Sequence, residues 1–221
     1  MRTIIYVDGF NLYYRMLKAR PQSKWLNPLE LARQILHPSH QIIRVNYYIA
    51  RVSSRAHDPD APARQAIYLK ALATVPEIMI HEGNFLTSET WMPLTNPPDA
   101  RPRGYNWAIP APAVVKVIKS EEKGSDVNLG AHLVRDAFTN AFDVAVVITN
   151  DSDLTEPMRI VTREASKQVG LLKPVKNATQ SLLNVSSWHL HIRPGHLSKS
   201  QFPNPVVTAD GSHIFKPATW V

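Results

Sequence analysis

Four aspartates stand where carboxylate chemistry is expected. Asp8 ends an apolar run near the N-terminus, Asp151 and Asp153 follow a second apolar run, and Asp126 follows a glycine. Carboxylates that converge repel one another unless a cation neutralises them. Oxygen ligands without cysteine suit a hard cation such as Mg²⁺ or Mn²⁺. One or two such ions can orient a water molecule for in-line attack at phosphorus.

Each of these acids also has a purely structural interpretation. Asp8-Gly9 is a common turn sequence, and Asp153 with Glu156 forms a helix-capping pair. Asp126 in the first turn of a helix is favoured by the helix dipole. The occurrence of acids after two apolar strands favours a functional site over three separate structural roles.

Several other kinds of site are excluded by the sequence. The chain has no cysteine, which excludes thiol catalysis and cysteine-bound metals. It has no dinucleotide G-x-G-x-x-G, no P-loop and no G-x-S-x-G motif. Phe10 stands where a phosphoaspartyl hydrolase needs a second acid. The pair His189/His191 could bind zinc, but the chain offers no cysteine to complete such a site, and we do not favour it.

The charge distribution favours a polyanionic partner. Lys and Arg number 25 against 18 Asp and Glu, a net charge of +7 over 221 residues. Nine of the acids fall within residues 121–164, while residues 1–29 hold five basic residues and one acid. Neutralisation of phosphates by such a surface releases counterions. No apolar run is long enough to span a membrane and no signal peptide is seen, so we expect a cytoplasmic protein.

Strand and helix patterns alternate along the chain. They predict strands at 3–7, 41–50, 77–81, 144–149, 169–172 and 188–192, and helices at 12–18, 29–36, 62–75, 125–141, 153–166 and 179–185. This alternation predicts an α/β sandwich with a mostly parallel sheet, in which ligands bind beyond the carboxyl ends of the strands.

Two segments lie outside this alternation. Residues 93–112 carry six of the 18 prolines, and we expect an edge hairpin with arms at 85–94 and 113–119 around this insertion of about 87–112. We predict one domain over residues 1–193, followed by a proline-containing tail, 194–221, that wraps the core or stays loose.

Three motifs resemble the NYN domain family, relatives of the PIN-like nucleases. Residues 5–12, Ile-Tyr-Val-Asp-Gly-Phe-Asn-Leu, are similar to the opening motif of that family. Glu122–Val127 resembles its E-K-G-x-D-V signature, and residues 147–154 resemble a strand ending in S-G-D-S-D-F. The likeness covers roughly residues 1–185. Thr149-Asn150 stands where Ser-Gly is usual, and Leu154 replaces an aromatic residue.

The resemblance implies a PIN-like three-layer fold and a metal-dependent ribonuclease, acting as an endonuclease with Mg²⁺ or Mn²⁺. It assigns the metal to Asp8, Asp126, Asp151 and Asp153, and it makes Asn11 the residue that orients the first acid or a water. The alternatives are a non-catalytic RNA-binding or regulatory module and a nuclease directed at DNA.

Further residues are predicted to contact RNA, and self-association into a homo-oligomer is left open. Basic groups and aromatic faces suit single-stranded RNA. Besides Asn11 and Thr149, the predicted substrate contacts are Lys123, Arg15, Lys18, Arg101 and Arg103.

Overall fold

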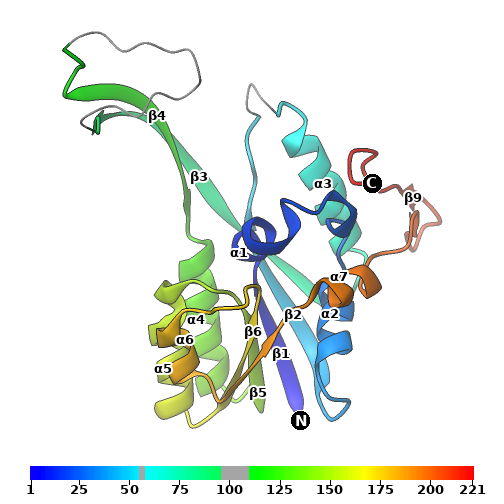
Figure 1. The fold of residues 1–221 in the computed structure, drawn as a ribbon. Helices are drawn as coiled ribbons and strands as arrows, with labels where there is room; N and C mark the ends of the chain where they lie inside the picture. Colours follow the sequence, from blue (N-terminus) through cyan, green and yellow to red (C-terminus); the bar gives the residue numbers. More distant parts are fainter. Residues whose placement is uncertain (55–57, 96–109) are drawn as a thin grey trace.

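A seven-stranded sheet forms the centre of the protein (Figure 1). The computed structural model describes residues 1–54, 58–95 and 110–221. The strands are β1 (Arg2–Asp8), β2 (Gln41–Ala50), β3 (Ile78–Pro93), β4 (Val114–Lys123), β5 (Val144–Ile148), β6 (Gln168–Lys173) and β7 (Trp188–His191). Their order across the sheet is β4-β3-β2-β1-β5-β6-β7, and every neighbouring pair is parallel except β3 and β4. The predicted α/β class with a mostly parallel sheet is confirmed.

Helices cover both faces of this sheet. One face carries α1 (Gly9–Leu12), the π-helical turn η1 (Tyr13–Leu17), the short 3₁₀ turn η2 (Pro21–Ser23), α2 (Pro28–Ile35), α3 (Ala61–Leu72) and α7 (Pro194–Lys199). The other carries α4 (Ser125–Phe138), the 3₁₀ turn η3 (Ser152–Leu154), α5 (Thr155–Arg163) and α6 (Gln180–Val185). The arrangement is consistent with a three-layer sandwich. A PIN-like identity stays a prediction.

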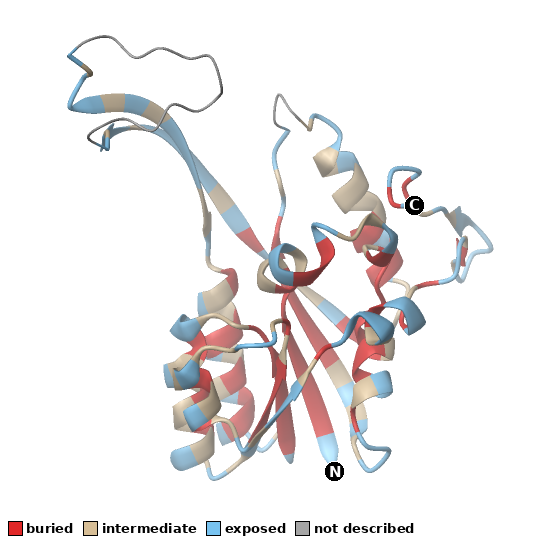
Figure 2. Cartoon of the chain, viewed as in Figure 1, coloured by how far each residue is buried: buried red, intermediate tan, exposed pale blue. Residues whose placement is uncertain are grey.

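The central strands read as continuous apolar runs because both of their faces are buried. In β1, Ile5 and Val7 pack into the core beneath α2 and α3, while Ile4 and Tyr6 pack beneath α4. This two-residue alternation follows from the pleat of a strand. Figure 2 shows the buried residues concentrated on β1, β5 and the inner helix faces. Asp8 is the charged residue that ends β1, directly after the buried residues 4–7.

Local sequence signals set several helix ends. The Asn27 side chain accepts hydrogen bonds from the N–H groups of Leu29 and Glu30, and Pro28 begins α2. Just after the C-terminal end of α4, Asn140 adopts a left-handed backbone with a φ of 54°. The helix predicted to reach residue 141 therefore ends at Phe138.

The edge hairpin is longer than the sequence suggested. The predicted strand 77–81 and the first hairpin arm are one continuous strand, β3, which pairs with β4 from Asn84 to Pro93. The hairpin extends beyond the body of the molecule (Figure 1). The predicted RNA contacts Arg101 and Arg103 lie outside the described residues.

The C-terminal segment packs on the core. It contains α7 and a small hairpin of β8 (Val206–Val207) and β9 (His213–Ile214). Trp220 is 8% exposed and lies edge-on to Trp25, with ring centroids 6.3 Å apart. Of the two arrangements left open for this segment, the structure has the one that wraps the core. In the part of the chain that is described, no helix has the length and apolarity to cross a membrane.

Candidate active site

The predicted acids lie near one another at the carboxyl edge of the sheet. Asp8 ends β1, Asp151 follows β5, and Asp126 lies in the first turn of α4. The charges of Asp126 and Asp151 both act on the Asp8 carboxylate. Asp153 and Asp151 act in the same way on Asp126. The topology therefore gathers carboxylates from three separated segments, as parallel strands require.

Burial, and after it the neighbouring carboxylates, favour protonation of Asp8 and Asp126. Burial, together with the charges of Asp126 and Asp151, raises the pKa of Asp8 to about 7, although hydrogen bonds from Asn11 and Thr149 lower it in part. Burial also raises the pKa of Asp126 to about 6, with contributions from Glu122, Asp151 and Asp153. Both acids are therefore protonated more readily than an ordinary aspartate.

Asn11 and Thr149 hold the edge in place through hydrogen bonds. The Asn11 N–H donates to Oδ1 of Asp8 at 2.9 Å, and the Thr149 hydroxyl donates to Oδ2 at 2.9 Å. The Asn11 side-chain oxygen accepts from the N–H of Asn150 at 3.0 Å, which links α1 to the end of β5. The Asp151 N–H donates to the Thr149 hydroxyl. In the structure, Asn11 and Thr149 thus position the acids.

The predicted metal centre is not formed by the described residues. Within residues 1–54, 58–95 and 110–221, no group of three or more His, Cys, Asp or Glu side chains is placed to hold a metal ion. Asp151 instead accepts a hydrogen bond from the Asp153 N–H, and Asp153 is exposed. The assignment of a metal ion to Asp8, Asp126, Asp151 and Asp153 therefore stays a prediction. Occupancy by Mg²⁺ or Mn²⁺ stays a prediction from the sequence.

The basic residues predicted to contact RNA are dispersed. Lys123 pairs with Glu121 at 3.3 Å and is exposed, and Arg15 is exposed on η1. Lys18 caps the C-terminal end of the same turn and lies over the ring of Tyr14. RNA as a partner, and the substrate-binding roles of these residues, stay predictions.

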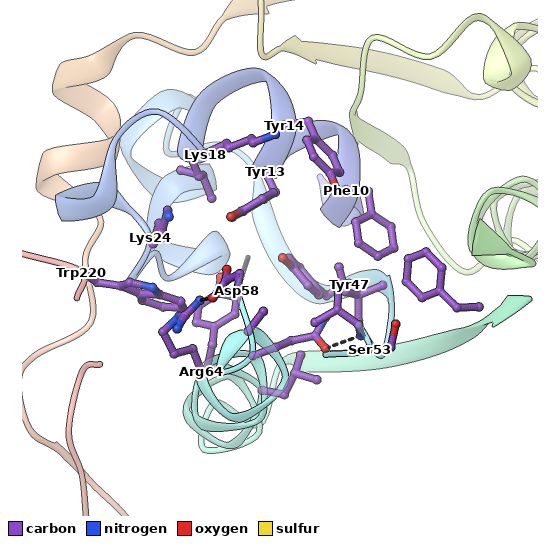
Figure 3. Close-up of a pocket in the computed structure, with 18 residues that line it drawn as sticks. Phe10, Tyr13, Tyr14, Lys18, Lys24, Tyr47, Ser53, Asp58, Arg64 and Trp220 are labelled. Atoms are coloured by element: carbon purple, nitrogen blue, oxygen red, sulfur yellow. Dashed lines mark hydrogen bonds and ion pairs between the residues drawn. The ribbon is translucent and has the colours of Figure 1, made fainter. Parts of the chain in front are cut away.

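An aromatic cavity lies beside the sheet edge that carries Asp8, on the face covered by α1 and α3. Its volume is about 220 Å³. Figure 3 shows side chains from α1, η1, β2, α3 and the C-terminal segment around it. The aromatic side chains of its wall are Phe10, Tyr13, Tyr14, Tyr47, Tyr68, Phe85 and Trp220.

Two buried tyrosines form the floor of this cavity. The Tyr68 hydroxyl donates to the carbonyl of Leu26 at 2.7 Å, and the Tyr47 and Tyr68 rings meet edge to face. Burial raises the pKa of both tyrosines above the ordinary value, so both are neutral phenols at physiological pH. The floor is therefore apolar and uncharged.

Three basic side chains and one carboxylate also line the cavity. Arg64 forms an ion pair with Asp58 (Figure 3). The Lys18 ammonium lies 5.1 Å from the centre of the Tyr14 ring, and the Lys24 ammonium lies 5.5 Å from that of Tyr13. Such cation–π placement keeps an ammonium close to an aromatic wall. The charged side chains of the cavity therefore sum to an excess of positive charge.

The residues that follow Asp8 bring it close to the cavity, which Phe10 and Tyr47 line. Gly9 follows Asp8 directly, and a Cβ on Gly9 would lie 2.6 Å from the Tyr48 carbonyl oxygen and 3.0 Å from the Tyr47 ring. Only glycine permits this approach. The Asp8 charge also raises the pKa of Tyr47 after the larger effect of burial. Phe10, two residues after Asp8, packs edge-on against Phe85.

Sequence reasoning missed this cavity because its residues come from segments far apart in the chain. The strand pattern at 41–50 identified Tyr47 only as a core residue. The sequence pattern predicts a short helix that contains Tyr13 and Tyr14, and it places Trp220 in a C-terminal tail. The available signal was the run Tyr13-Tyr14-Arg15, in which adjacent aromatics precede a cation.

Comparisons with known proteins bear on the function. No protein-family model matches the sequence. The chain is 29% identical, over an alignment of 245 residues, to 6-hydroxy-3-succinoylpyridine 3-monooxygenase HspA of Pseudomonas putida, an alignment that covers all of this chain and 75% of that protein. The fold is similar to the crystal structure of a protein of unknown function from Vibrio parahaemolyticus, with a TM-score of 0.51, 15% identity and coverage of 91% and 96% of the two chains.

The prediction of a metal-dependent ribonuclease is wrong. A relative that aligns with the whole chain is named a monooxygenase, which is an oxidoreductase and not a hydrolase. The endonuclease assignment and the alternative of a DNA-directed nuclease are wrong for the same reason. The short motifs that resemble the NYN family reproduce a strand-end geometry, and that geometry does not fix the reaction. The family resemblance itself stays a prediction.

Proposed function

We propose that the protein is a monooxygenase that acts on a small aromatic compound bound in the cavity. The observation that carries the proposal is the 29% identity over the whole chain to a monooxygenase whose named substrate is a substituted pyridine. The cavity supports it, because aromatic walls suit a planar ring. The 220 Å³ volume is below the roughly 300 Å³ lower end for drug-sized ligands, which favours a single-ring compound.

The reaction defines what else must reach the site. One atom of dioxygen is added to the aromatic compound and the other leaves as water, with two electrons and two protons from a reduced donor. A reduced flavin or nicotinamide is the ordinary class of such a donor. The protein then has to bind the ring, orient it and keep water away from it.

The turn after β1 does not fit the pyrophosphate of a dinucleotide donor. The Asp8 carboxylate accepts from the Asn11 N–H, one of the groups at the start of α1 that a phosphate would need. α1 has four residues, and Gly9 is packed against β2. The 220 Å³ cavity also does not accommodate a flavin ring system beside an aromatic substrate. We therefore derive no step through a resident flavin, and we treat the donor as a diffusible co-substrate.

Substrate-dependent oxygen consumption tests the proposal. Each reaction contains purified protein, 6-hydroxy-3-succinoylpyridine and one reduced nicotinamide, either alone or with added flavin. A parallel set of reactions omits the aromatic compound. The expected result is consumption of dioxygen and donor in a one-to-one ratio that requires both protein and aromatic compound. Donor oxidation that is the same with and without the aromatic compound, for every donor, would overturn the proposal.

A further inference from the structure

The cavity combines an aromatic wall with an excess of cations. Lys18 and Lys24 reach it from the chain that follows α1, and Arg64 reaches it from α3 (Figure 3). Arg64 is paired with Asp58. Among the described residues neither lysine ammonium forms an ion pair, and each lies instead over a tyrosine ring. The two ammonium groups can therefore interact with a ligand bound in the cavity.

Lys24 is the more constrained of the two. Burial lowers the pKa of Lys24, and the nearby Arg64 guanidinium lowers it as well, against the attraction of Asp58. An ammonium in this position has lost part of its water and faces another cation. An anionic ligand group beside the Lys24 ammonium would restore the lost solvation and offset the repulsion from Arg64.

The aromatic residues define where the rest of such a ligand would lie. Tyr13 and Tyr14 are edge to face with centroids 5.4 Å apart, and Phe10 stacks on Tyr14 at 6.4 Å. These rings belong to α1 and η1, the segment that also carries Lys18. A planar ring on the neutral floor of Tyr47 and Tyr68 would therefore lie in the same cavity as the Lys18 ammonium, over Tyr14, and the Lys24 ammonium, over Tyr13.

We propose that the cavity is a binding site for a single-ring aromatic carboxylate, with the ring on the tyrosine floor and the carboxylate on Lys18 and Lys24. The proposal rests on the proposed function and names its substrate class. A neutral aromatic compound lacks the group that the two ammonium ions would bind. A nucleotide carries an anion and a ring, but base and ribose together exceed a site suited to one ring.

Calorimetric titration without oxygen or donor tests this site. The ligands are 3-succinoylpyridine, which carries a carboxylate, its primary amide, which is neutral, and uridine 5′-monophosphate. We expect the carboxylate to bind about tenfold or more tightly than the amide, since a charge-assisted hydrogen bond is stronger than a neutral one. The double variant Lys18→Met with Lys24→Met should bring the two affinities within about twofold of each other.

A matched control is available on α3. Lys70 is exposed and does not line the cavity, so Lys70→Met should retain the full preference for the carboxylate. Thermal unfolding followed by circular dichroism checks that each variant is folded. Equal affinity of the native protein for acid and amide, failure to bind either, a preference that survives the double variant, or tighter binding of the nucleotide would each overturn the site.

The failure of this site can be distinguished from failure of the proposed function. If the protein binds the carboxylate selectively but shows no substrate-dependent oxygen consumption, the binding site is supported and the monooxygenase proposal is wrong. Oxygen consumption that is unchanged in the Lys18→Met, Lys24→Met protein keeps the reaction and removes the site.

Discussion

The Thr149 hydroxyl donates a hydrogen bond of 2.9 Å to the Asp8 carboxylate, and both residues are buried at the carboxyl ends of neighbouring parallel strands. Thr149 also accepts a hydrogen bond from the Asp151 N–H. One hydroxyl therefore joins the end of β1 to the turn after β5. It is the contact that ties the first acid to the second acid-bearing segment.

We predict that Thr149→Val lowers the free energy of unfolding by about 1 kcal/mol at neutral pH, because a buried carboxylate loses a donor. The same change should raise the pKa of Asp8, since the Thr149 hydrogen bond lowers it. Urea titration and carbon-detected NMR of the Asp8 carboxyl measure the two effects. Thr87→Val is the control, because Thr87 is exposed on β3 and bonds only to Ser120 among the described residues. An unchanged Asp8 titration in Thr149→Val would show that the hydrogen bond has no role.

Stability should fall as pH rises from about 4 to about 7. Burial raises the pKa of Asp8 to about 7 from 3.8, so the folded state holds this proton over a range in which the unfolded state has lost it. The stability that the proton contributes is complete below the unfolded pKa and is lost as the pH passes the folded pKa. Asp126, with its pKa raised to about 6, acts in the same direction.

The variant Asp8→Asn should flatten this dependence. Its amide keeps the shape of the carboxyl without the charge, so we expect its unfolding free energy at pH 8 to exceed that of the native protein by on the order of 1 kcal/mol. Urea titrations at pH 5 and pH 8 measure the difference. A native protein that is as stable at pH 8 as at pH 5, with an unchanged variant, would contradict a raised Asp8 pKa.

The wall formed by Trp220 should matter for both stability and binding. Its ring centroid lies 6.0 Å from that of Tyr68 and 6.3 Å from that of Trp25. Trp220→Ala should lower the unfolding free energy by about 3 kcal/mol, as for other buried tryptophans, and weaken aromatic ligand binding. Phe215→Ala is the control in the same segment, because Phe215 is 63% exposed. If the two variants bind the ligand with the same affinity, Trp220 does not contribute to the binding site.

A buried ionic cluster on the opposite face should affect stability alone. Asp136 accepts hydrogen bonds from the Tyr6 hydroxyl at 2.8 Å and from the guanidinium groups of Arg44 and Arg135. Asp136→Asn leaves those cations without a buried counter-charge and should lower the unfolding free energy by about 3 kcal/mol. Asp143→Asn, in an exposed ion pair with Arg2, should have a much smaller effect. Ligand binding should be retained in both, and its loss in folded Asp136→Asn protein would contradict a site confined to the other face.

The sheet could be predicted from the sequence because its signals are local. β1 and β5 are unbroken apolar runs that end in polar residues, and this pattern identifies buried parallel strands and their carboxyl ends. The proximity of Asp8, Asp126 and Asp151 followed from topology alone. The extent of β3 did not follow, because its outer half pairs only with β4 and lacks a buried face.

The reaction class could not be predicted in the same way. Acids at strand ends are compatible with a metal, with shared protons or with a helix cap, and sequence spacing does not separate these outcomes. The cavity depends on Tyr13, Tyr68 and Trp220 meeting in space across more than 200 residues of chain. No local pattern links these positions, so the aromatic site emerges only from the tertiary fold.

Isotopic labelling tests the monooxygenase proposal most directly. The protein is incubated with 6-hydroxy-3-succinoylpyridine, a reduced donor and labelled dioxygen (¹⁸O₂), and the aromatic product is analysed by mass spectrometry. A monooxygenase places one labelled oxygen atom in each product molecule and none when the label is supplied as water. Product without label from dioxygen, or no product with any donor, would contradict the proposal.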